Sequence, residues 1–210
     1  MGLLLTIACV YKPGNGLGGD YVFRLREGFK KHCRKPHRFV CLTNQVLSGV
    51  ERIPLKHGWT GYWNKIELFR PGLFEGPVCY CDLDAMIVRD ITDMVEHPYE
   101  FVCGTNWKGS ADHINSAFMC WDGRTDFSQI YDTYSPSINE QYEQDWRSWG
   151  DQGFIQDHLP VRFTSLNELF PGRIASYKID VRPANKVPED TSIVMFHGRP
   201  RPHQLNWKLP

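Results

Sequence analysis

The sequence has no net charge and no long apolar segment. Its 24 basic and 24 acidic side chains cancel, so no overall positive field draws the chain toward nucleic acid, and a nucleic-acid partner is not favoured. No apolar run approaches the roughly 20 residues that span a bilayer, which predicts that the chain has no transmembrane segment. The apolar start, residues 1–10, lacks a basic leader and is too short for a secretory signal. We therefore expect a cytoplasmic protein.

The cysteines lack the spacing of a zinc site. The chain has seven of them, an odd number, and most lie in apolar runs such as FVCLT and VCYCD. We therefore expect buried, reduced thiols that behave as small hydrophobic groups. Cys79 and Cys81 are separated by one residue, which on a strand places both thiols on the same face. No second Cys/His pair at zinc-finger spacing accompanies them, so a structural zinc site is not expected.

Internal repeats and low-complexity linkers are also missing. At 210 residues the chain is predicted to form a single domain, 1–210. Apolar and turn patterns predict strands at 3–11, 39–42, 51–55, 78–83, 101–105, 117–121 and 193–197, and helices at 21–32, 63–69, 127–134 and 155–158. Residues 146–152 read as a loop that leads into a helix. This alternation predicts an α/β fold with a mostly parallel central sheet and helices on both faces.

Three predicted strands end in polar residues, at the edge where ligands bind in such sheets. The first ends near Tyr11, another at Asp82 and Asp84, and the last at His197. The two aspartates interrupt an apolar run, where an unpaired charge is costly. Because they leave the strand end on the same side, they are suited to Mg²⁺ or Mn²⁺, which takes one or two carboxylates plus substrate phosphates. A turn cap or an arginine partner is the structural alternative.

Four other segments accompany the aspartate pair in a fixed order. They are WNKIELF with Lys65, INSAFMCW with Asn115 and Ser116, GDQGFI with Asp151 and Gln152, and FHGRPRPH with His197, Gly198, Arg199 and Arg201. With the aspartates they extend over roughly residues 60–203, and in this order they resemble glycosyltransferase family 8, a GT-A group that includes glycogenin and bacterial galactosyltransferases. Ala117, Arg201 and His203 depart from the family's usual Gly, Lys and Trp, so the sugar and the acceptor are not carried over.

The resemblance implies a Rossmann-like GT-A domain and a hexosyltransferase. Its donor is expected to be a nucleoside-diphosphate sugar, a UDP-sugar, with Mn²⁺ or Mg²⁺ as cofactor and retention at the anomeric carbon. Asp82, Asp84 and His197 are the implied metal ligands, and Asp82 is also expected to contact the ribose. The acceptor stays open between a glycan, a lipid-linked glycan, a protein and a small molecule. The tail 198–210, rich in Pro, Arg and His, is expected to close over the donor.

Further roles are assigned to residues around the implied donor. Arg199 and Arg201 are expected to grip the diphosphate, because a guanidinium matches phosphate bidentately. Gly198 permits a close backbone approach, and Lys65 reaches a phosphate or the sugar. A solvated basic tail and an exposed helix lysine are the structural alternatives. Tyr11, or alternatively Tyr21, is available for stacking on the base.

The sugar itself is expected to contact polar residues from two segments. Asn115 and Ser116 are expected to bond its hydroxyl groups or to line the acceptor side. Asp151 and Gln152 are expected near the reacting carbon, where Asp151 orients the sugar and stabilises positive charge at the anomeric centre.

Three other functions fit parts of the pattern. Gly14, Gly16 and Gly19 match the G-x-G-x-x-G loop of NAD-dependent oxidoreductases, although the second predicted strand ends near 43–44 without an acidic residue for the ribose. The Asp82–Asp84 pair also fits a haloacid-dehalogenase-like phosphatase, with a nucleophile and an acid/base, but Met86 stands where that family has Thr or Val. A non-catalytic sugar-binding protein is the third, since seven Trp and nine Tyr suit saccharide stacking.

Overall fold

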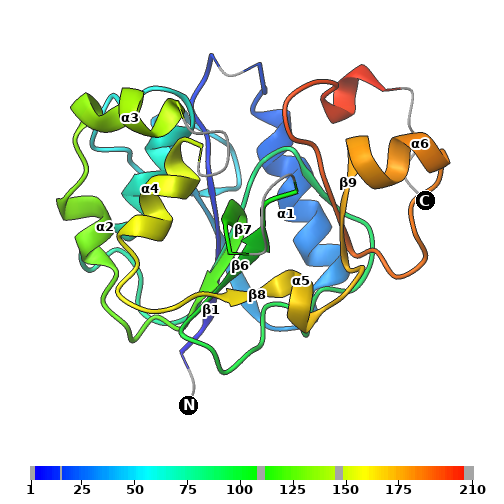
Figure 1. Cartoon of the computed structure of the whole chain (residues 1–210). Coiled ribbons are helices and arrows are strands. Elements are labelled where there is room, and N and C mark those ends of the chain that lie inside the picture. The colour runs from blue at the N-terminus through cyan, green and yellow to red at the C-terminus, as the bar shows by residue number, and fades with distance from the viewer. Residues whose placement is uncertain (1–2, 15, 108–111, 145–148, 206–210) are drawn as a thin grey trace.

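The computed structural model describes the chain except for residues 1–2, 15, 108–111, 145–148 and 206–210. Strands and helices alternate around a central sheet (Figure 1). The strands are β1 (Leu5–Val10), β2 (His37–Leu42), β3 (Glu51–Ile53), β4 (Val78–Cys81), β5 (Ala85–Ile87), β6 (Phe101–Thr105), β7 (Ile114–Trp121), β8 (Thr164–Ser165), β9 (Ile174–Ser176) and β10 (Ile193–Met195). The α-helices are α1 (Asp20–His32), α2 (Ser128–Asp132), α3 (Asn139–Glu143), α4 (Asp151–Asp157), α5 (Leu166–Leu169) and α6 (Arg182–Ala184). Within the described part of the chain, no helix combines the length and apolar character needed to cross a membrane.

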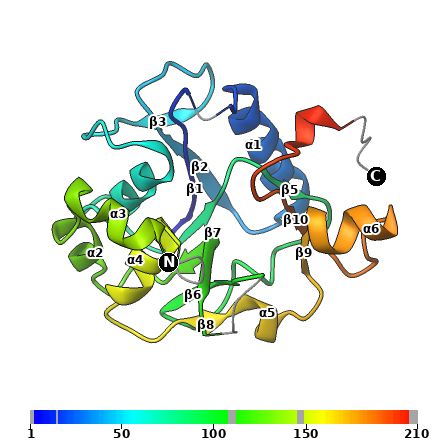
Figure 2. The same ribbon diagram turned by 45° about the horizontal axis from the view of Figure 1, so that its top comes forward.

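The central sheet has seven strands in the order β3-β2-β1-β4-β7-β6-β8. The pairs β3/β2, β2/β1, β1/β4 and β6/β8 are parallel, whereas β7 runs antiparallel to β4 and β6. This confirms the predicted mostly parallel α/β sheet. A second sheet, β5-β10-β9, joins three short strands beside it (Figure 2).

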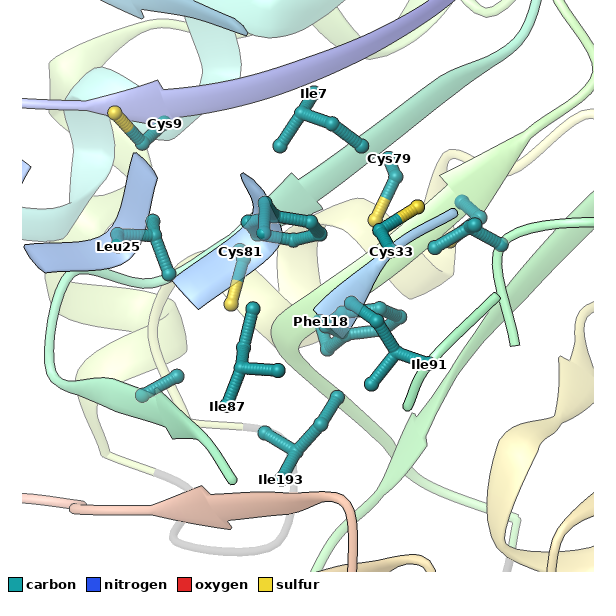
Figure 3. Close-up of a cluster of buried hydrophobic side chains, with 14 of the residues drawn as sticks. Ile7, Cys9, Leu25, Cys33, Cys79, Cys81, Ile87, Ile91, Phe118 and Ile193 are labelled. Carbon is teal, nitrogen blue, oxygen red and sulfur yellow. The ribbon is translucent and has the colours of Figure 1, made fainter. Parts of the chain in front are cut away.

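Apolar side chains pack on both faces of the central sheet. On one face, Leu25 and other buried residues of α1 meet Cys79 and Cys81 of β4 and Phe118 of β7 (Figure 3). On the other face, the neighbouring Tyr80 of β4 packs with the 3₁₀-helix η1 (Gly61–Phe69) and with α4. The two cysteines therefore share a face, as predicted. All seven cysteines are free and buried, which confirms the expected reduced thiols.

Most predicted elements are present, with shifted ends. The helix at 21–32 corresponds to α1, and the predicted helix at 127–134 to the shorter α2. The predicted helix at 155–158 begins earlier, as α4, and the strand at 117–121 begins earlier, as β7. Two short 3₁₀ turns, η2 (Pro136–Ile138) and η4 (Pro202–Gln204), and the π-helical turn η3 (Tyr177–Val181) were not predicted.

The second sheet corrects one expectation. The predicted strand at 193–197 is β10, and it pairs with β5 and β9 rather than with the central sheet. The sequence did not predict β5 or β9, because strands of three residues are too short to show an alternating pattern. As a result, the last strand delivers its polar end from a separate sheet.

We expect the substitution Phe118→Ala to destabilise the fold by about 3–5 kcal/mol, because it opens a cavity where α1 packs on the sheet. Phe118 has no exposed surface. Urea unfolding measures the loss, and Val46→Ala is the control, since the Val46 side chain is 87% exposed. Equal stability of both variants would contradict this packing.

Candidate active site

Two adjoining cavities open where β1 and β4 end. The larger has a volume of about 1120 Å³ and the smaller about 350 Å³. Both are lined by Tyr62, Lys65, Asp82, Asp84 and Arg201. The carboxyl edge of the sheet is therefore hollow, as the polar strand ends predicted. A third cavity of about 410 Å³, between α1 and β5, is largely apolar. Of the predicted site residues, it is lined by Tyr21, the alternative candidate for base stacking.

A tight turn directs the two predicted metal ligands into these cavities. The Asp82 backbone N–H donates to the Ala117 carbonyl (2.8 Å), and the Ala85 N–H donates back to the Asp82 carbonyl (3.1 Å). The Asp82 carboxylate accepts a hydrogen bond from the Tyr80 hydroxyl. Burial and the Asp82 charge raise the pKa of Tyr80 well above its usual value, which keeps the hydroxyl protonated as a donor. The Asp84 carboxylate forms an ion pair with Arg201.

Lys65 lies at the centre of a buried polar network. Its side chain comes from η1, and the residue is only 4% exposed. The Nζ atom lies 2.8 Å from Asp151 Oδ2 and 3.3 Å from Asp82 Oδ1, and it donates to Ser116 Oγ at 2.9 Å. The Ser116 hydroxyl donates in turn to Asp151 Oδ2 at 2.7 Å. Burial alone lowers the pKa of Lys65, but Asp151 and Asp82 outweigh it and raise the pKa above its usual value. The ammonium group therefore stays charged.

Local backbone geometry places Asp151 in this network. Asp151 is the first residue of α4 and follows Gly150, whose φ is +68°. A Cβ on Gly150 would lie 2.7 Å from the Tyr62 ring, so only glycine fits both the turn and the close approach. Gln152 follows on the helix and lines the larger cavity. At the rim, Trp149 is 47% exposed, and its indole N–H donates to the Glu143 carbonyl at 2.9 Å.

The segment after β10 forms the opposite wall. His197 and Gly198 line the larger cavity. The His197 ring lies 6.3 Å from the Trp107 ring in a stacked arrangement, and its Nε2 shares a 2.7 Å hydrogen bond with the Ser176 hydroxyl. Gly198 has a φ of +78°. Arg199 is exposed and lines neither cavity, so the structure does not bring it to Arg201 and the aspartates.

The other residues predicted to contact the donor lie in different surroundings. Asn115 lines the larger cavity, with its Oδ1 accepting from the Ala117 N–H at 3.0 Å. Ser116 also borders it but is buried, and it bonds Lys65 and Asp151. Tyr11 lines the smaller cavity. Tyr21 is only 3% exposed and its hydroxyl contacts His203, so the alternative stacking role for Tyr21 is not supported.

Sequence reasoning missed several residues of this site. It did not single out Tyr80, Trp107 or Ser176, which bond or stack on predicted site residues. Tyr80 could have been found, because it lies on β4, two residues before Asp82. Trp107 and Ser176 come from segments without a motif, and only the folded arrangement brings them to His197.

The two aspartates fit a hard divalent cation only together with a substrate. Among the described residues, no group of three or more His, Cys, Asp or Glu side chains could hold a metal ion. Asp82, Asp84 and His197, the three implied ligands, are therefore not gathered around one point in this structure, and their role as metal ligands stays a prediction. Two carboxylates on one cavity still suit Mg²⁺ or Mn²⁺ when phosphate oxygens complete the shell. For that, Asp84 must exchange its Arg201 partner for the ion.

No family model and no curated protein sequence matches the chain. Its structure, however, is similar to several solved glycosyltransferases. GlyE of Streptococcus pneumoniae TIGR4 matches with a TM-score of 0.65 and 12% identity over 96% of this chain, which spans 56% of GlyE. The galactosyltransferase LgtC, in complex with donor and acceptor sugar analogues, matches with a TM-score of 0.59 and 10% identity, covering 94% of this chain and 88% of LgtC. A glycosyltransferase involved in glycosylation of the major capsid of PBCV-1 matches with a TM-score of 0.58 and 12% identity, covering 96% and 97%.

The chain has the GT-A glycosyltransferase fold. All three of these structures are glycosyltransferases, and the fold that the sequence resemblance implied is confirmed. At these identities the comparison concerns the fold alone.

We expect Lys65→Met to lower stability by about 3–5 kcal/mol, because it leaves the buried Asp151 charge unpaired. Urea unfolding measures the loss. The double variant Lys65→Met/Asp151→Asn removes that charge as well and should recover part of the stability. If the double variant loses as much as the sum of the two single substitutions, the residues are not coupled and this network is wrong.

Proposed function

We propose that the protein is a metal-dependent glycosyltransferase that moves a hexose from a nucleoside-diphosphate sugar, most simply a UDP-sugar, to an acceptor. The observation that carries the proposal is the meeting of Asp82 and Asp84 with Lys65 and Arg201 in one cavity at the end of β4. The glycosyltransferase fold supports it, as does LgtC, a galactosyltransferase whose structure holds donor and acceptor sugar analogues. We extend the proposed domain over the whole chain, 1–210.

The site has the charges that departure of a diphosphate requires. Negative charge develops on the leaving diphosphate, and cations fixed in advance stabilise it. Asp82 and Asp84 would hold Mn²⁺ or Mg²⁺, which supplies Lewis-acid stabilisation of that charge. Arg201, once it leaves Asp84, can donate two parallel hydrogen bonds to phosphate oxygens. Arg199 lies outside the cavities, and the tail would have to change its conformation for Arg199 to join Arg201 at the diphosphate.

Asp151 is positioned to act on the sugar. Its Oδ2 atom is held by Lys65 and Ser116, while the residue borders the larger cavity with Gln152 and Asn115. A carboxylate fixed in this way can orient the donor sugar and stabilise positive charge at the anomeric carbon. Lys65 then acts on the sugar through Asp151. Retention of configuration is part of the proposal and follows the family resemblance.

The walls of the cavities suggest where the other parts of the substrates bind. Tyr11, which lines the smaller cavity, is proposed to lie beside the nucleotide base. Gly198 offers its backbone to the diphosphate, and His197 is retained as a proposed third metal ligand that must first leave Ser176. Trp149, which is 47% exposed, and the less exposed Tyr62 border the larger cavity. This side is proposed for a glycan, lipid-linked, protein or small-molecule acceptor.

A thermal-shift panel tests this function against the alternatives. It compares UDP, GDP, CDP, ADP and NAD, each with and without Mn²⁺. A ligand at about 100 times its dissociation constant should stabilise the protein by about 2.7 kcal/mol. Stabilisation by one nucleoside diphosphate only with Mn²⁺ would support the proposal and name the base. A metal-independent shift with NAD would favour an oxidoreductase that uses the loop at Gly14–Gly19, and phosphate release from an aryl phosphate would favour a phosphatase.

We expect Asp84→Asn to remove Mn²⁺-dependent UDP binding and to reduce sugar transfer or donor hydrolysis at least a hundredfold, because one of two carboxylate ligands is lost. Calorimetry with and without Mn²⁺ measures binding. Asp132→Asn, at an exposed position of α2, is the matched control. An Asp84→Asn variant with parental UDP affinity in Mn²⁺ would remove the basis for this metal site.

We expect Arg201→Gln to have opposite effects on the two ligands. Without its ion pair to Arg201, Asp84 is free, so Mn²⁺ alone should bind more tightly, while UDP in saturating Mn²⁺ should bind about tenfold more weakly. Manganese paramagnetic resonance measures the first effect and calorimetry the second. Parallel changes in both affinities would contradict the proposed exchange of Arg201 between Asp84 and the phosphates.

A further inference from the structure

The cations nearest the two aspartates already have carboxylate partners. Lys65 pairs with Asp151 and Asp82, and Arg201 pairs with Asp84. Together these five side chains carry three negative and two positive charges. An incoming diphosphate therefore gains little from them until the pairs are rearranged. A cation without such a partner would contribute more, because it exchanges only water for phosphate.

Lys178 is such a cation, and it lies next to Gly198 on the opposite wall of the larger cavity. A Cβ placed on Gly198, which lines that cavity, would lie 3.3 Å from the Lys178 Nζ atom. The ammonium group therefore lies directly over the Gly198 backbone. Within the part of the chain that the structure describes, neither a hydrogen bond nor an ion pair engages Lys178. Sequence reasoning did not single it out, since no motif surrounds it.

The backbone that carries Lys178 is held firmly in place. Lys178 belongs to η3, a π-helical turn, and such turns are frequent at functional sites. The Ser176 hydroxyl accepts the Ile179 N–H at 3.2 Å, and the Asp180 carboxylate accepts the Ser176 N–H at 2.7 Å. Asp180 is therefore bonded to the backbone, although it lies two residues from Lys178.

Packing and strand pairing fix the same segment against the cavity wall. The Tyr177 ring stacks on Phe196, with centroids 4.5 Å apart and planes 12° apart. Strands β9 and β10 run side by side in the small sheet, with Ser176 opposite Met195 (Figure 2). The two residues that follow these strands, Tyr177 and Phe196, thus bring Lys178 next to Gly198.

We propose that Lys178 binds the diphosphate of the nucleotide-sugar donor across Gly198, in addition to the proposed contact from Arg201. The inference rests on the proposed function, and it adds a residue that neither the motifs nor the comparisons indicate. Gly198 has no side chain, so a phosphate oxygen can approach its backbone and the Lys178 ammonium together. A compact ammonium group on a flexible stem suits this contact, because it binds phosphate as a point charge.

The test measures how Lys178→Gln changes affinity for uridine, UMP and UDP by calorimetry in saturating Mn²⁺. We expect uridine to bind as in the parent and UDP to bind about tenfold more weakly, as for the loss of one charge-assisted hydrogen bond. Lys178→Arg should retain most of the UDP affinity, and the difference between parent and Lys178→Gln should shrink as KCl rises. Lys186→Gln is the matched control, because Lys186 lies in the same connection between β9 and β10 but pairs with Glu189 at the surface.

Each outcome separates this inference from the proposed function. If the parent binds UDP and Lys178→Gln binds it equally well, the role of Lys178 is overturned and the glycosyltransferase proposal stands. If the parent binds none of the nucleoside diphosphates of the panel, both are overturned. An equal loss for uridine and UDP would show that the substitution disturbs the cavity as a whole, and would also overturn a phosphate contact. Unfolding curves of the two variants should match the parent, since no described partner is lost.

Discussion

The ammonium group of Lys65 connects four parts of the chain that are distant in sequence. It comes from η1 and meets Asp82 after β4, Ser116 on β7 and Asp151 at the start of α4. A charge this deeply buried is tolerated only when partners surround it. The burial of the Lys65 charge therefore depends on the correct position of every one of these partners. Because these partners border the cavity, the same contacts that stabilise the fold also set the spacing of the groups that would meet a substrate.

Charge balance explains why the two aspartates line the cavity and yet do not form a metal site by themselves. Asp84 is neutralised by Arg201 and Asp82 by Lys65, so a divalent cation alone finds little excess negative charge. A diphosphate alone meets carboxylates whose cations are occupied. In the proposed function, metal and diphosphate together would satisfy both, since the ion would take the carboxylates and the phosphates would take the released guanidinium. Under that proposal, the site would favour joint binding of metal and diphosphate over binding of either one alone.

Local sequence patterns predicted the central sheet, α1 and the acidic end of β4, because each depends on a run of apolar residues with a clear period or a clear end. The reduced thiols followed from the same runs. Short strands were not predictable, and β10 was placed in the wrong sheet because pairing depends on the distant β5 and β9. The candidate site was predicted by residue type but not by partner. Nothing near Asp84 in sequence indicates that Arg201 reaches it. Ser116 was expected to bond sugar hydroxyl groups or to line the acceptor side, and no pattern predicted its bonds to Lys65 and Asp151.

Strand pairing in the small sheet also fixes the distance between the two walls of the cavity. In the antiparallel pair of β5 and β10, Ala85 lies opposite Met195. Asp84 therefore adjoins one member of this pair of opposed residues, and the segment Phe196–Gly198 adjoins the other. Because the two strands are paired, a rotation of β10 that moves the segment after it also moves the turn that carries the aspartates. The distance between the aspartate carboxylates and Gly198 thus depends on the register of β5 against β10. A shift of that register by one residue would change the distance in one discrete step.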